Sequence, residues 1–134
     1  MYEYHVKEIV KIVDGDTVDL VLDLGFSTFV QQRLRLKGID TPELSSTNES
    51  ERIIANEAKG YVSVWLINQK KLTVKTFKDD KYGRIIAEIY GDDSLCLNKI
   101  LIDNGYAWEY DGSKPRNNDV NILLEKRKIN AISN

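Results

Sequence analysis

The chain has 134 residues, and 42% of them are hydrophobic, which is enough for one compact core and short for two. We therefore expect a single domain over residues 1–134. Its 19 Lys and Arg residues are outnumbered by 21 Asp and Glu residues, which argues against coating of nucleic acid through bulk positive charge. No apolar run has the length of a signal peptide or a membrane span. We expect no membrane association and, unless the chain is a trimmed mature form, a cytoplasmic protein.

The first forty residues contain three segments that resemble strands. Residues 6–13 and 18–24 are rich in β-branched and apolar side chains, and an acidic turn at 14–17 separates them. This pattern predicts a hairpin. After a turn at Gly25, residues 26–36 alternate apolar with polar side chains, as a third strand would.

The rest of the chain predicts a mixture of helices and strands. Pro42 ends the third strand, and a polar loop leads to Ser50, which we expect to cap the next helix. In chain order, the further predicted elements are a helix at 51–67, strands at 72–77 and 85–90, and helices at 95–104 and 119–129. The order predicts an α+β protein, mainly a β barrel, although strand content alone also fits small barrels other than the five-stranded Greek-key OB-fold with about three helices.

Two aspartates in predicted turns have the chemistry of ligands for a hard cation. Asp16 and Asp40 stand at turns on opposite sides of the same hairpin system. If they converge with a backbone carbonyl such as that of Thr41, the oxygen set suits Ca²⁺. Acidic residues also make and cap turns, so either aspartate alone has a purely local explanation.

Three further side chains fit phosphate chemistry. Glu43 follows Pro42, which holds its carboxylate near a metal at Asp40 and able to contact a water as a general base. Arg35 and Arg84 carry planar forks that bind phosphate oxygens and stabilise a five-coordinate phosphorus. The alternatives are a solvated glutamate and arginines paired with carboxylates of the barrel.

Three motifs together resemble the staphylococcal nuclease (thermonuclease) family. They are Asp-Gly-Asp-Thr at 14–17, Asp-Thr-Pro-Glu at 40–43 and Asp-Lys-Tyr-Gly-Arg at 80–84. The resemblance runs in order from about residue 7 to near the C-terminus. It implies an OB-fold, a five-stranded Greek-key barrel with about three helices.

The resemblance also implies roles for ten residues. Ca²⁺ would be bound by two carboxylates and a carbonyl, a glutamate would position or activate the attacking water, and two arginines would grip the scissile phosphate. Two residues would lie near a terminal phosphate, and two aromatic rings would form a wall beside the nucleotide, although both rings also have a core-packing explanation. In that order, the residues are Asp16, Asp40 and Thr41; Glu43; Arg35 and Arg84; Lys81 and Tyr82; Trp108 and Tyr110.

The function implied by the resemblance is a Ca²⁺-dependent nuclease. It would hydrolyse phosphodiester bonds of DNA and RNA with little sequence specificity, prefer single strands, act as a monomer and leave 3′-phosphate ends. One alternative is a non-catalytic OB-fold module that binds nucleic acid or a protein. Another is a domain in which Ca²⁺ only rigidifies the barrel.

Overall fold

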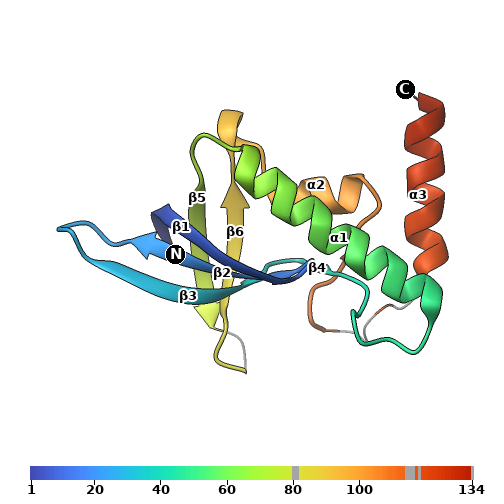
Figure 1. Cartoon of the computed structure of the whole chain (residues 1–134), viewed down its shortest axis with the longest axis horizontal. Coiled ribbons are helices and arrows are strands. Elements are labelled where there is room, and N and C mark those ends of the chain that lie inside the picture. The colour runs from blue at the N-terminus through green and yellow to red at the C-terminus, as the bar shows by residue number, and fades with distance from the viewer. Residues whose placement is uncertain (80–81, 114–116, 118, 134) are drawn as a thin grey trace.

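Five strands form the main body of the fold: β1 (Tyr2–Asp14), β2 (Thr17–Asp23), β3 (Phe29–Leu36), β5 (Thr73–Asp79) and β6 (Ile85–Tyr90). The computed structural model describes residues 1–79, 82–113, 117 and 119–133, and these strands close into a barrel (Figure 1). The order around the barrel is β1-β2-β3-β6-β5, with β3 and β6 parallel and the other neighbours antiparallel. The predicted five-stranded OB-fold is confirmed.

The barrel core follows from the alternation of apolar side chains along the strands. On β2, Val18, Leu20 and Leu22 are at most 2% exposed, and on β3 the same holds for Leu34 and Leu36. Successive side chains of a strand point to opposite faces, so residues two apart share the inner face of the barrel. Val18 pairs directly with Leu34 across the two strands, which sets their register.

Three helices accompany the barrel: α1 (Glu49–Asn68), α2 (Leu97–Asp103) and α3 (Val120–Ser133), with a short 3₁₀ turn η1 (Asp92–Ser94) before α2. Figure 1 shows α1 running along one side of the barrel, with α3 standing near the first turns of α1. The buried face of α1 repeats every four residues, at Ile54, Ala58, Val62 and Leu66. Within the described residues, no helix combines the length and the apolar character needed to cross a bilayer.

The start of α1 differs from the prediction. Asn48, rather than Ser50, caps the helix, because its extended backbone lets its side-chain oxygen accept from the backbone N–H of Glu51 at 3.0 Å. Both residue types are good caps, so composition alone did not separate them. At the other end of the chain, α3 continues to Ser133, four residues beyond its predicted end.

A short two-stranded pair was not predicted and is important for the site. It joins β4 (Ile39–Asp40) to β7 (Trp108–Glu109) in antiparallel register. The bond from Tyr110 N to the carbonyl oxygen of Gly38, at 2.9 Å, extends the pair by one link. The pair ties the turn after β3 to the segment that precedes α3, so residues some seventy positions apart in sequence line the same region.

Candidate active site

Eight of the ten residues singled out in the sequence line one cleft of about 1410 Å³. The cleft opens at one end of the barrel, between the β1–β2 turn, the segment after β3, the residues before β6 and the segment after β7. The eight residues are Asp16, Arg35, Asp40, Thr41, Glu43, Tyr82, Arg84 and Tyr110.

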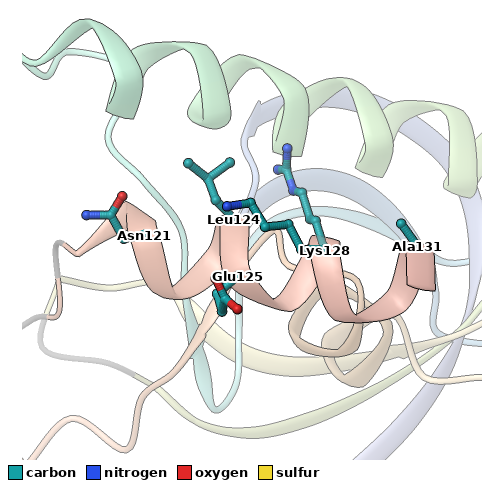
Figure 2. A pocket seen from close by; sticks show the side chains of 6 residues that line it. Asn121, Leu124, Glu125, Lys128 and Ala131 are labelled. Atoms are coloured by element: carbon teal, nitrogen blue, oxygen red, sulfur yellow. The ribbon is translucent and has the colours of Figure 1, made fainter. Parts of the chain in front are cut away.

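A second hollow, of about 420 Å³, lies along α3 and has a structural explanation (Figure 2). Its six lining residues all come from that helix: Asn121, Leu124, Glu125, Arg127, Lys128 and Ala131. Arg127 donates to the carbonyl oxygen of Gly105 at 3.0 Å and pairs with Glu57 of α1 at 2.7 Å. The hollow therefore belongs to the seam between α1 and α3, and the first cleft is the candidate active site.

The base of the cleft is formed by Asp16, Arg35, Asp40 and Thr41, which we call the floor. Nη2 of Arg35 lies 3.5 Å from Oδ2 of Asp16 and 3.4 Å from Oδ1 of Asp40. The three side chains are only 12%, 9% and 8% exposed, respectively. The backbone N–H of Thr41 donates to Oδ2 of Asp16 at 3.1 Å, so two chain segments meet at this carboxylate.

Backbone carbonyls also hold the Arg35 side chain in place. Its Nη1 donates to the carbonyl oxygen of Leu36 at 3.0 Å, and its Nη2 donates to that of Ile39 at 2.9 Å. These bonds close the turn between β3 and β4 around the guanidinium. Arg35 is therefore fixed before any ligand binds, which is the condition for electrostatic stabilisation without reorganisation.

Asp14 also lines the cleft, and sequence reasoning did not select it. Burial, and the neighbouring Asp16 carboxylate, raise the pKa of Asp14 to about 7. For Asp16, burial acts upward, but hydrogen bonding with Asp14 and the charge of Arg35 outweigh it and lower its pKa. The signal in the sequence was a turn with two acids, of which only the second was considered.

The donor set of the floor fits a hard cation such as Ca²⁺. Carboxylate oxygens of Asp16 and Asp40 converge on a single positively charged nitrogen of Arg35. Ca²⁺ accepts carboxylate, carbonyl and water oxygens, which is the chemistry available here. Across residues 1–79, 82–113, 117 and 119–133, no three His, Cys, Asp or Glu side chains form a metal-binding group by themselves.

The edge of the cleft is formed by Glu43, Tyr82, Arg84 and Tyr110, which we call the rim. Glu43 is exposed, and its backbone N–H donates to Oε1 of Glu51 at 3.1 Å. Tyr82 is 71% exposed, with its ring centroid 5.3 Å from the guanidinium carbon of Arg84. The rim thus combines a carboxylate, a guanidinium and two aromatic rings around a buried charged floor.

Among the described members of the ten, Trp108 does not line the cleft. Trp108 is 3% exposed and packs with Ile54 of α1 and Leu123 of α3, while its indole N–H donates to the carbonyl oxygen of Asp119 at 3.0 Å. This corrects the expectation of a stacking surface, because both the ring and its polar atom are used inside the fold. Lys81 lies outside the described residues.

Comparison with known proteins supplies the family. Residues 33–133 match the family described as "Staphylococcal nuclease homologue". The chain belongs to this family. It is 32% identical over 103 residues to an uncharacterized endonuclease of Escherichia coli, and the matched region covers 77% of this chain and 60% of that protein. It is also 32% identical over 101 residues to the thermonuclease of Staphylococcus hyicus, with 75% and 56% of the two chains covered.

A longer relative shares the same region. Endonuclease YhcR of Bacillus subtilis is 29% identical over 107 residues, which is 75% of this chain but only 8% of that protein. The chain therefore spans 60% or less of the length of these three relatives. In each case the matched portion is about three quarters of the present chain.

Proposed function

We propose that this chain is a Ca²⁺-dependent nuclease that hydrolyses phosphodiester bonds of DNA and RNA with little sequence specificity and leaves 3′-phosphate ends. The observation that carries the proposal is the buried floor, in which Arg35 lies within 3.5 Å of both Asp16 and Asp40 in a cleft that the exposed Glu43 also lines. Family membership and the printed names of the endonuclease and thermonuclease relatives support the same activity.

In the proposed reaction, Glu43 accepts a proton from a water molecule whose oxygen attacks phosphorus in line with the leaving group. The bond between phosphorus and the 5′ oxygen breaks, and that oxygen leaves with a proton from solvent. Arg35 and Arg84 donate to the non-bridging oxygens, where negative charge increases in the five-coordinate state. A Ca²⁺ held by Asp16, Asp40 and the Thr41 carbonyl would supply positive charge to the same oxygens.

The rim also supports a preference for single strands. Tyr82 and Tyr110 line the cleft, and stacking of an unpaired base on a tyrosine is worth roughly 1–3 kcal/mol whatever the base. Such stacking explains low sequence specificity without any contact to base edges. We propose that a monomer binds the substrate, since all the groups used in this scheme belong to one chain.

The test uses the purified chain with single-stranded DNA, duplex DNA and RNA, in the presence of Ca²⁺, Mg²⁺ or a chelator. We expect cleavage in Ca²⁺, with 3′-phosphate ends identified by mass spectrometry and fastest for single strands. The Glu43→Gln variant serves as the catalytic control. Intact substrate under all conditions, with retention of a labelled oligonucleotide, would instead favour the non-catalytic binding module.

A further inference from the structure

The loop between Glu43 and α1 is held by a buried acid that the proposed reaction does not use. Glu51 is 9% exposed, although its side chain is acidic and lies in the first turn of a helix. Its Oε1 accepts from the backbone N–H of Glu43 at 3.1 Å, and its Oε2 accepts from Oγ of Ser46 at 2.9 Å. Both carboxylate oxygens therefore bind the loop that leads from the cleft to the helix.

This arrangement differs from an ordinary helix start. A glutamate at the third position of a helix commonly reaches back to the backbone N–H of the capping residue. Here the N–H of the capping residue, Asn48, donates to Oγ of Ser46 at 3.1 Å, and Glu51 binds eight residues upstream instead. The N-terminal end of α1 favours a negative charge at Glu51, which strengthens its bonds to the loop.

Glu43 is consequently held on both sides. On its N-terminal side, the N–H of Thr41 donates to the buried Asp16, and Pro42 is buried. On its C-terminal side, the backbone of Glu43 itself is bound by Glu51, which is part of a 20-residue helix packed on the barrel. The carboxylate of Glu43 extends from a backbone anchored both to the floor and to α1.

We propose that Glu51 is a positioning residue, which acts through the backbone N–H of Glu43 to hold that carboxylate over the floor. This inference rests on the proposed function, because it assigns Glu51 a role in the step that Glu43 performs. A displacement of about 1 Å at a catalytic group can lower the rate on the order of 10²-fold. Loss of the Glu51 carboxylate should therefore lower kcat while the binding of substrate at the aromatic rim is kept.

The chain offers matched variants for the test. Glu51→Ala removes both acceptors, whereas Glu51→Gln keeps an acceptor for Glu43 and a polar partner for Ser46. Glu49 is an exposed acid in the first turn of the same helix, so Glu49→Ala controls for lost charge at the helix start. With a single-stranded oligonucleotide and Ca²⁺, we expect kcat to fall about 10- to 100-fold in Glu51→Ala, with KM nearly unchanged. Glu51→Gln and Glu49→Ala should stay close to the parent.

A double variant separates positioning from general stability. If Glu51 acts through Glu43, Glu51→Ala should cause little further loss in a Glu43→Gln background. Amide hydrogen exchange provides a readout independent of catalysis: the Glu43 N–H should exchange faster in Glu51→Ala and remain protected in Glu51→Gln. Assays below the melting temperature of each variant keep the folded fraction constant.

The outcomes distinguish the two proposals. Two results with an active parent would overturn the role of Glu51 alone. One is a kcat of Glu51→Ala equal to that of Glu49→Ala. The other is a double variant in which the kcat losses of Glu43→Gln and Glu51→Ala multiply fully. A parent that cleaves none of the substrates would overturn the proposed nuclease, and the positioning role with it. Unchanged exchange of the Glu43 amide in Glu51→Ala would overturn the positioning role whatever the activity.

Discussion

Strand β3 carries two arginines, two residues apart, and each has carboxylate partners. Arg33 forms a two-pronged pair with Asp19, with Nε 2.8 Å from Oδ1 and Nη2 3.0 Å from Oδ2. Arg35 contacts Asp16 and Asp40 at 3.5 and 3.4 Å. The side chain of Arg33 is 49% exposed, whereas that of Arg35 is 12% exposed.

The difference shows what separates a local ion pair from a candidate active site. Arg33 and Asp19 are direct partners across β2 and β3, and both oxygens of the carboxylate are used by one fork. Arg35 instead gathers carboxylates from the β1–β2 turn and from β4. In the proposed reaction, this buried guanidinium, held by acids of two separate segments, donates to the phosphate.

The largest expected effect is on stability. Replacing Arg35 by Met removes the cation that lies beside the buried carboxylates of Asp16 and Asp40. Removing one partner of a buried ion pair typically costs about 3–5 kcal/mol of stability. Arg33→Met should have a smaller effect, because the Arg33 side chain is 49% exposed and solvent screens its charge. Urea unfolding in a chelator measures both. Equal shifts of the two midpoints would break the comparison.

The next largest expected effect is on activity, and it should again differ between Arg35 and Arg33. In Arg35→Lys the charge remains, but the fork that donates to Leu36 and Ile39 is lost and phosphate is bound less well. We expect kcat to fall by about 10²- to 10³-fold, as for loss of one preorganised donor. Arg33→Lys should cleave a single-stranded oligonucleotide at the parent rate. A fully active Arg35→Lys would remove Arg35 from the proposed reaction.

Metal dependence should follow the floor as well. If Asp40 is a ligand, Ca²⁺ at a hundred times its dissociation constant should stabilise the parent by about 2.7 kcal/mol, and Asp40→Asn should lose most of that gain. Asp19→Asn should keep it, since Asp19 lies outside the residues that line the cleft. Thermal melts with Ca²⁺ and with chelator measure the gain. The same Ca²⁺ response in both variants would place the metal elsewhere.

The smallest expected effect is a pH dependence of the stability that the pair between Arg33 and Asp19 contributes. The hydrogen bond from Arg33 holds the pKa of Asp19 below its ordinary value. A lowered pKa in the folded state stabilises the protein above the unfolded value of about 4, and the gain is lost as pH falls through the folded value. The difference in urea midpoint between the parent and Arg33→Met should therefore shrink from pH 7 to pH 3. A difference that grows on acidification would contradict the assignment.

Much of the fold and the membership of the cleft could be predicted because they depend on local signals. The alternation of apolar residues predicted the five barrel strands. Six of the eight predicted residues that line the cleft belong to the three motifs, and Arg35 and Tyr110 came from the wider family resemblance. The catalytic and metal-binding roles of those residues stay predictions. The two-residue strands β4 and β7 were missed because so short a segment has no measurable periodicity.

Other features depend on contacts between distant residues. Trp108 was expected to stack on a base, with core packing as the alternative, and only its packing with Ile54 and Leu123 decided that it is buried. Asp14 acquires its raised pKa from burial beside Asp16, which a turn motif does not specify. The hydrogen bond from the backbone N–H of Glu43 to the Glu51 carboxylate joins a loop to a helix, and no sequence spacing predicts it.

By itself, the sequence determined the family, the barrel strands and the charged residues available for chemistry, because periodicity and short motifs are properties of neighbouring residues. The tertiary structure decided which of these residues meet. It buried Arg35 between two carboxylates, moved Trp108 into the core and placed Glu51 behind Glu43. The physical reason is that burial, pKa and hydrogen-bond partners arise when separate segments exclude water from one another, which happens only in the folded chain.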